Sequence, residues 1–266
     1  ALSSAASDVY KRQEYIDDVP STPVWRGSDY LLFYGKGPVK WEYDSSSQTF
    51  VHTNNPYSLY GYYFVTDATP TNDMTSVAQA SGASTRITTY DDYLLHEQEL
   101  VSVNQSGREF FGEDFSGARP RTISTFSSIP GITDADGKVT MRFISRINSG
   151  SGTASLSIND SELLDITIPS IQTVSSNVRS YTKAIPGTTT ALWKGSKSEK
   201  NNVVVSYSSS GHTNVRLDYI RMQFVRTLRP YGACTFFRSL TSVGNSSRFV
   251  ISEANSNTLV FDVTDA

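Results

Sequence analysis

One cysteine and three histidines are the residues of this chain that could support cysteine peptidase chemistry. Such a peptidase needs a thiolate held beside an imidazole. The candidate pairs join Cys234 to one histidine each, namely His52, His96 or His212. Cys234 lies within residues 231–237, an apolar stretch that is typical of a strand, where a cysteine behaves as a small buried hydrophobe. We therefore predict no catalytic residue in this chain.

Carboxylate pairs and metal loops are the other chemistry that the sequence offers. Four glutamates could supply the acid pair of a glycosidase: Glu97, Glu99, Glu109 and Glu113. Acids this dense near loops are, however, typical of a solvated surface rather than of a facing pair. Residues 134–137 begin like a calcium loop but have no acidic closing ligand, which favours a hairpin turn. Residues 35–38 lack the third glycine and the helix of a phosphate site. No metal or cofactor is predicted.

Trp193 is the residue that most resembles part of a ligand surface. It lies in a polar, loop-like stretch between two predicted strands, where an indole either stacks on a sugar or covers the edge of a sheet. The pattern favours covering the edge. Arg108 and Glu109 are two further candidates for a binding role, against the simpler interpretation that both charges are solvated beside a turn.

Residues 96–115 form the most distinctive stretch of the chain. Within it, residues 106–113 (SGREFFGE) combine two glycines, three charges and two large aromatics. Glycines this close mark special backbone angles. The simplest interpretation is a turn that seats Phe110, Phe111 and Phe115 in a core, and the alternative is a binding or catalytic role.

Composition limits the class of protein. Charged residues make up 18% of the 266 residues and the net charge is −3, so there is no basic field for nucleic acid or an anionic membrane. Aromatic residues reach 12%, with 15 Tyr and 13 Phe, a composition typical of strands with polar outer faces. The single cysteine excludes an internal disulfide framework. We expect an exported all-β protein without a membrane span.

Alternating apolar residues predict strands from residue 29 onward. Residues 39–44 and 49–53 alternate on either side of a serine-rich turn, which predicts a hairpin. Residues 60–66 carry aromatics on both faces, which predicts a central strand. Residues 93–101 fit either a short helix or a strand that runs into the block at 96–115, and we favour the strand.

A β-sandwich is predicted in the middle of the chain. Five runs alternate apolar and polar residues, as expected for strands buried on one face: residues 139–143, 154–158, 164–168, 202–207 and 214–224. In the last run the apolar set shifts by one position, which predicts a β-bulge near Tyr219 and Ile220. Strands at this spacing without intervening helices predict an antiparallel sandwich of jelly-roll type, flanked by a smaller β-sheet subdomain.

Four segments follow from these patterns. Residues 1–27 are interpreted as a non-native or disordered lead-in, because the first thirteen resemble translated adapter sequence. Residues 28–97 form an N-terminal β subdomain and residues 98–226 the sandwich. Residues 227–266 contain three short predicted strands, at 234–240, 248–253 and 258–264. These strands either return to the first subdomain or lead into a further domain.

The block at residues 96–115 resembles a marker of a known family. The matching residues are His96, Glu97, Asn104, Ser106, Gly107, Arg108, Glu109, Phe110, Phe111, Gly112, Glu113 and Phe115. They are similar to the block HE…N…SGREWFGE.F, which precedes the peptidase domain in the PorU family, the gingipain-like sortases of the type IX secretion system. Shorter stretches agree with the same family in the same order, at residues 33–38, 41–43, 50–52, 55–58 and 62–64 upstream and 217–220, 237–238 and 261–264 downstream.

The resemblance implies that this chain is the non-catalytic N-terminal β-region of a PorU-like sortase. The full-length parent would be a gingipain-type cysteine endopeptidase at the outer-membrane surface of a Gram-negative cell, where it processes secreted cargo and attaches it to the surface. Its partners would be the downstream peptidase domain of the same polypeptide and type IX cargo proteins or other secretion components. The alternative is an independent carbohydrate-binding sandwich, with a glycan as ligand.

Overall fold

The computed structural model describes residues 21–65, 72–78, 81–103, 107, 109–117, 119–147, 150–171, 184–209 and 212–264. They form two compact units. The N-terminal unit comprises the residues up to Glu42, His52–Ser81 and the residues from Ser256 onward. The sandwich unit comprises Tyr43–Val51 and Gly82–Asn255.

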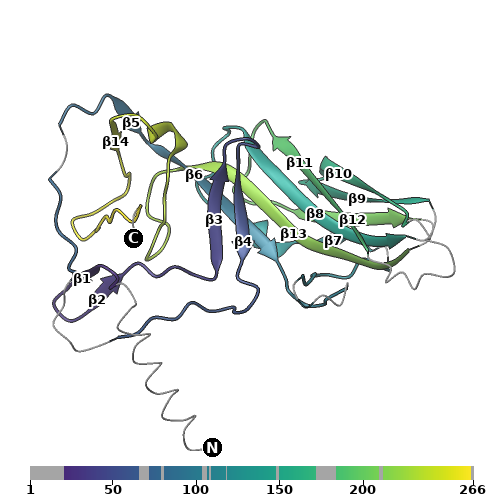
Figure 1. The fold of residues 1–266 in the computed structure, drawn as a ribbon. Coiled ribbons are helices and arrows are strands. Elements are labelled where there is room, and N and C mark those ends of the chain that lie inside the picture. Colours follow the sequence, from purple (N-terminus) through teal and green to yellow (C-terminus); the bar gives the residue numbers. More distant parts are fainter. Residues whose placement is uncertain are drawn as a thin grey trace, which may run out of the picture. The chain divides into compact units, whose positions relative to one another are not determined.

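Eight strands of the sandwich unit form two four-stranded antiparallel sheets (Figure 1). One sheet has the order β10-β9-β12-β7 and the other the order β11-β8-β13-β6. Their bounds are β6 (Thr89–Glu97), β7 (Arg121–Thr122), β8 (Gly137–Ile147), β9 (Ser151–Ile158), β10 (Ser161–Pro169), β11 (Ile185–Trp193), β12 (Val203–Ser209) and β13 (His212–Thr227). The predicted antiparallel β-sandwich is confirmed, and the stretch before the block at 96–115 is a strand rather than a helix.

The core of the sandwich unit follows the alternation of the sequence. On β8, Val139, Met141 and Phe143 are completely buried, whereas Lys138 and Arg142 are only partly buried. Thr140, between Val139 and Met141, is buried as well, with 4% of its surface exposed. Phe143 stacks on Tyr207 of β12 in the opposite sheet, with ring centroids 5.7 Å apart and planes 10° from parallel. Each apolar side chain buried in this way stabilises the fold by roughly 1.5–3 kcal/mol relative to its exposed state.

Strand β13 contains the predicted bulge. Its pairing register with β8 shifts between Leu217 and Tyr219, so Asp218 is the extra residue. Because of this insertion, Leu217 before it and Ile220 after it are both fully buried. The sequence-based position was correct to within about one residue.

Strand β11 was not predicted, because the threonine-rich middle of its sequence, residues 187–190, contains no large apolar residue. It lies at the edge of its sheet, next to β8, and its residues are alternately exposed and partly buried. Pro186 is accommodated because an edge strand needs no amide donor on its outer side. In the stretch around Trp193, which was expected to be loop-like, residues 191–193 are the end of this strand and residues 194–197 belong to no strand.

The segment after β13 forms fewer strands than predicted. Only β14 (Ser247–Phe249) forms there, and it pairs in parallel with β5 (Thr85–Ile87), not with the strands of the N-terminal unit. Residues 234–240 and the described residues from 258 onward belong to no strand. Short 3-10 turns are η1 (Ser124–Phe126) and η2 (Leu240–Ser242). In the described part of the chain, no helix is long and apolar enough to cross a membrane.

The N-terminal unit contains short strands. β1 (Val24–Arg26) pairs with β2 (Leu31–Phe33), so this part of the predicted disordered lead-in is wrong; residues 1–20 lie outside the described residues. The predicted hairpin is confirmed as β3 (Val39–Asp44) and β4 (Thr49–Asn54), and its tip belongs to the sandwich unit. Trp25 contacts Phe261, with ring centroids 6.0 Å apart.

The central strand predicted at residues 60–66 is wrong for the described residues 60–65. They form no strand, and Tyr60, Tyr62 and Phe64 are 70%, 76% and 65% exposed. Residue 66 lies outside the described residues. The stretch runs beside residues 33–37 instead, where Tyr63 donates a hydrogen bond of 3.0 Å to the carbonyl oxygen of Lys36. Aromatic residues on both faces indicated burial on both sides, which this unit does not provide.

Candidate functional site

The block at residues 96–115, which we call the marker block, is fastened to the sandwich by backbone hydrogen bonds. Gly112 donates to the Leu217 carbonyl at 2.8 Å, Leu217 donates to the Glu113 carbonyl at 3.1 Å, and Phe115 donates to the Val215 carbonyl at 2.8 Å. The block therefore lies along β13 immediately before the bulge. Within the block, residues 104–106 and 108 lie outside the described residues. The candidates Ser106 and Arg108 are therefore not described.

The two glycines of the marker block play different roles: Gly107 has the special backbone angle that was predicted, and Gly112 permits a close approach of two chain segments. Gly107 has a φ of 69°, which a residue with a side chain adopts only at a cost. Gly112 is buried, and a methyl group on it would lie 3.2 Å from the side chain of Gln98 and 3.4 Å from the Leu217 carbonyl oxygen. Gly112 thus permits the close approach of the block to β13.

The aromatic residues of the marker block pack into two different clusters. Phe115 joins the main core of the sandwich, and Phe111 packs with Ile144, Val103 and Ala184 in a smaller cluster. Both rings are 1% exposed, whereas Phe110 is partly exposed. The interpretation of the block as a turn that seats rings in a core is confirmed for Phe111 and Phe115.

His96 and Glu113, at opposite ends of the marker block, bind one another. The Nε2 atom of His96 lies 2.6 Å from Glu113 Oε1, and its Nδ1 atom lies 2.7 Å from the hydroxyl of Thr125. Burial alone would raise the pKa of Glu113, but hydrogen bonds from His96 and from its own backbone amide outweigh burial and lower it. His96 thus joins β6, the marker block and η1, and both of its ring nitrogens are already engaged.

A second polar cluster surrounds the bulge residue Asp218. Its carboxylate contacts the guanidinium of Arg142 on β8, and the same guanidinium lies 3.2 Å from Glu109 of the marker block. Burial raises the pKa of Asp218 to about 6, although Arg142 acts to lower it, and the charges of Glu97 and Glu109 add to the increase. Glu109, a candidate for a binding role, is thus half-exposed and paired with an arginine.

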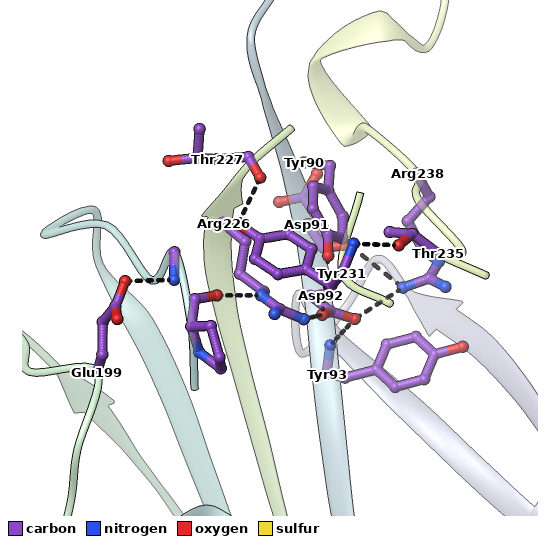
Figure 2. Close-up of polar contacts among 12 residues, drawn as sticks. Tyr90, Asp91, Asp92, Tyr93, Glu199, Arg226, Thr227, Tyr231, Thr235 and Arg238 are labelled. Atoms are coloured by element: carbon purple, nitrogen blue, oxygen red, sulfur yellow. Dashed lines mark hydrogen bonds and ion pairs between the residues drawn. The ribbon is translucent and has the colours of Figure 1, made fainter. Parts of the chain in front are cut away.

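A third polar cluster surrounds Asp92 on the edge strand β6 (Figure 2). Arg226 of β13 donates to Asp92 Oδ2 at 2.8 Å and to the Pro130 carbonyl at 2.8 Å. Arg238 approaches Asp92 Oδ1 at 3.6 Å and donates to the backbone oxygen of Asp91 at 3.2 Å. The aspartate therefore faces two guanidinium groups that are distant from it in sequence.

Tyr231 completes the Asp92 cluster and ties the next segment to the sandwich. The guanidinium of Arg226 lies 3.7 Å from the centre of its ring, and its hydroxyl donates to the Thr227 carbonyl at 2.9 Å. Its amide donates to Thr235 Oγ1 at 2.7 Å (Figure 2). The predicted boundary between residues 226 and 227 is consequently bridged by stacking and hydrogen bonds, and both sides belong to the sandwich unit.

Trp193 lies in the main core of the sandwich and is 6% exposed. Lys197 lies over its ring, with Nζ 5.4 Å from the centroid. The same amine donates to the Ala135 carbonyl at 2.8 Å, and the Lys197 amide donates to Asp134 Oδ1 at 2.8 Å. Lys197 therefore hydrogen-bonds to oxygen atoms of Asp134 and Ala135 in the calcium-like stretch. The indole of Trp193 is buried and leaves little surface for a sugar to stack on. Among the described residues, no group of three acidic, histidine or cysteine side chains could hold a metal.

The cysteine and histidines do not form a peptidase pair among the described side chains. Cys234 is exposed and belongs to no strand, which corrects its assignment as a buried strand residue. The aromatic residues around it indicated a strand but pack through their rings instead, as Phe237 does against Tyr90. His52 lies in the N-terminal unit against Trp41, with ring centroids 5.5 Å apart, and the side chain of His212 lies outside the described set.

Comparison with known proteins gives a match among solved structures but none among family models or curated proteins. The crystal structure of dimeric latent PorU from Porphyromonas gingivalis is similar, with a TM-score of 0.74 and 30% identity over 90% of this chain. The match spans 22% of the PorU chain. This chain therefore has a PorU-related fold.

Two further structures are similar only at a level that supports no argument. A Bacillus endospore appendage has a TM-score of 0.26 at 8% identity, covering 58% of this chain and 99% of its own. The CBM35 module of Abf62 from Cellvibrio japonicus has a TM-score of 0.23 at 16% identity, covering 51% and 97% respectively.

Proposed function

We propose that this chain is the non-catalytic N-terminal β-region of a PorU-like sortase of the type IX secretion system. The observation that supports this function is the PorU-related fold, which extends over 90% of the chain. The residues that carry the sequence resemblance to that family support it too, because they interact with one another: His96 pairs with Glu113, and Phe111 fills a core. Because its side chains are engaged in contacts within the sandwich unit, the marker block has a structural role in that unit.

The full-length parent in this proposal is an exported, gingipain-type cysteine endopeptidase at the outer-membrane surface of a Gram-negative cell. It cleaves secreted cargo and attaches it to the surface. This chain corresponds in extent to 22% of PorU, so most of such a polypeptide lies outside it. The thiol and imidazole of the reaction are then supplied by a peptidase domain that follows, and its cargo are type IX substrates.

Within that parent, the sandwich unit positions a neighbouring domain or cargo and does not take part in the cleavage reaction. Its polar clusters are used internally, since Arg142 and Arg226 each bridge elements of the unit through a carboxylate. Groups held in this way keep a surface rigid, and a rigid surface can orient a neighbouring domain or cargo. In the described residues no observation favours the carbohydrate-binding alternative, because Trp193 is buried.

The test compares this 266-residue chain with a chain extended through the domain that follows it. Both are assayed under reducing conditions on peptides that carry C-terminal sorting sequences. The extended chain should cleave them, and iodoacetamide should abolish the cleavage because a thiolate is the nucleophile. The 266-residue chain should be inactive, and replacing its one cysteine (Cys234→Ala) should leave the activity of the extended chain unchanged.

Two outcomes would overturn the proposal. Thiol-dependent turnover by the 266-residue chain that disappears in Cys234→Ala would make this region catalytic. An extended chain without any peptidase activity, when correctly folded by circular dichroism, would remove the link to a cysteine endopeptidase.

A further inference from the structure

An uncharged aromatic run covers part of the N-terminal unit. It comprises residues 57–65 (YSLYGYYFV), and there is no charged residue from Asn54 through Thr66. Tyr57, Leu59 and Val65 are 87%, 73% and 88% exposed, in addition to the exposed Tyr60, Tyr62 and Phe64. Six large side chains in nine consecutive positions are thus left largely in water.

One side of the aromatic run already has a neighbour. Tyr63 contacts Phe33, with ring centroids 5.2 Å apart, and donates its hydroxyl to the Lys36 carbonyl. A methyl group on Gly61 would lie 2.7 Å from that same carbonyl oxygen, so the backbone of the run passes close to Lys36. The run is therefore held in place through Gly61 and Tyr63, while the residues beside them are exposed.

A run of this composition is costly to leave uncovered. Tyr, Phe and Val favour strands, and an uncharged stretch of high β-propensity is an aggregation hazard when it is exposed. Monomeric proteins rarely expose such contiguous apolar patches unless they bind another surface. The N-terminal unit has no means of burying it, since none of its described hydrophobic side chains is classed as buried.

We infer that the aromatic run is a docking surface for a domain that follows this chain in the same polypeptide. This inference rests on the proposed function, because it assumes such a domain. Its occupant is a protein surface that is apolar and uncharged, complementary to tyrosine and phenylalanine side chains. Aromatic residues that bury large areas at low entropic cost are the residues enriched in such interfaces.

The end of the chain favours this occupant. Phe261 packs against Trp25 in the N-terminal unit, and Leu259 and Val260 beside it are exposed. A domain that continues from there is tethered to the unit that carries the aromatic run. Tethering replaces a bimolecular association by an intramolecular one at an effective concentration in the millimolar range, so even a modest interface is occupied.

Hydrogen exchange tests the inference directly. The backbone amides of residues 57–65 are compared between the 266-residue chain and the chain extended through the following domain. We expect exchange in the extended chain to slow by on the order of 100-fold, because docking excludes water from the run. Amides of β8 and β13 are the internal control and should exchange equally in both chains.

Variants then separate docking from folding. In the extended chain, Tyr60→Ser combined with Tyr62→Ser should restore fast exchange in residues 57–65. The matched control is Leu192→Ser combined with Val243→Ser, which removes two comparably exposed apolar side chains from the sandwich unit. This control should leave exchange in the run unchanged.

The outcomes distinguish the inference from the proposed function. Cleavage activity in the extended chain together with unprotected residues 57–65 would overturn the inference and leave the function standing. Protection without activity would support the docking surface and overturn the function. Protection that appears in the 266-residue chain at high concentration would make a second copy the occupant, and a reading frame that ends at Ala266 would leave no domain to dock; either result overturns the inference.

Discussion

The sandwich unit and the N-terminal unit handle their apolar residues in opposite ways. Every hydrophobic side chain classed as buried in the described chain belongs to the sandwich unit. The N-terminal unit instead relies on ring contacts, such as those of Trp25 and Tyr63, and leaves other aromatics exposed. The sandwich unit can therefore account for its own stability, whereas the N-terminal unit must draw on additional contacts.

The ion pairs of the two units differ in burial in the same way as their apolar side chains. The ion pair of Arg226 with Asp92 in the sandwich unit is mostly buried, with side chains 13% and 14% exposed. The pair of Arg26 with Asp73 in the N-terminal unit is 44% and 54% exposed. Buried pairs are coupled to the fold, while exposed pairs contribute little. Matched substitutions in the two units test this contrast.

The largest effect is expected for Phe111→Ala in the sandwich unit. Removing this ring should lower the free energy of unfolding by about 3–5 kcal/mol, because apolar contacts are lost and a cavity remains. Phe64→Ala, at an exposed ring of the N-terminal unit, should change it by less than about 0.5 kcal/mol. Urea unfolding of the two variants measures both values. Equal effects would mean that the marker block does not depend on its core ring.

The second-largest effect is expected when a buried guanidinium is removed from the sandwich unit. Arg226→Ala leaves the Asp92 carboxylate with the more distant cation of Arg238 and the neutral donors of Tyr90 and Tyr93, and should destabilise the sandwich unit by about 3 kcal/mol. Arg26→Ala removes an exposed pair and should cost less than about 1 kcal/mol. Thermal unfolding at low and high salt separates the two further, since only the exposed pair is strongly screened. A salt-sensitive Arg226 pair would contradict its assignment as buried.

The bulge residue should make the stability of the sandwich unit depend on pH. The pKa of Asp218 is raised from 3.8 to about 6 in the folded state, so the folded chain holds a proton that the unfolded chain releases. Its favourable contribution is present below about pH 4 and disappears as the pH rises through 6, a change on the order of 3 kcal/mol.

The measurement for Asp218 is the free energy of unfolding of the wild type minus that of Asp218→Asn, across pH 4 to 7. This difference should fall as the pH rises. A difference that grows with pH would show that Arg142 dominates and that the carboxylate is stabilised as an ion.

The smallest effect concerns His96. His96→Ala removes the donor to Glu113 and should cost roughly 1.5–3 kcal/mol, as for a hydrogen bond to a charged group. Thr125→Val removes only a neutral partner of the same ring and should cost about 1 kcal/mol. Differential scanning calorimetry resolves the order. A larger loss in Thr125→Val would indicate that η1, and not the marker block, depends on the imidazole.

The sandwich could be predicted from the sequence because its strands bury one face. On β8 the alternation of Val139, Met141 and Phe143 specifies which side points inward, and on β13 the change of phase locates the bulge. β11 was missed since an edge strand of threonines needs little apolar area. The special backbone angle of Gly107 was predictable from the sequence. The close approach at Gly112 and the pairing of His96 with Glu113 were not, because each depends on contacts that only the fold brings together.

The errors share a cause. Aromatic residues signal contact but not the kind of contact. Around Cys234 the aromatic side chains pack ring against ring without strand pairing. In residues 60–65, Tyr63 contacts Phe33, and most of the other large side chains are exposed. One sequence signal of the Asp92 cluster is the pair of adjacent acids, Asp91 and Asp92, next to the apolar residues of β6. Which arginine meets which aspartate depends on the fold, because Asp92 and Arg238 are far apart in the sequence.

The contact between Trp25 and Phe261 affects the order in which parts of the chain can fold during synthesis. These two rings come from opposite ends of the chain, and β5 likewise pairs in parallel with β14 near the end. During synthesis, the first segments leave the ribosome long before their partners exist. Strands that are adjacent in sequence, such as β9 and β10, can pair first. Trp25 therefore remains without its ring contact until Phe261 has been synthesised, so this part of the N-terminal unit is completed after strand pairs of the sandwich such as β9 and β10.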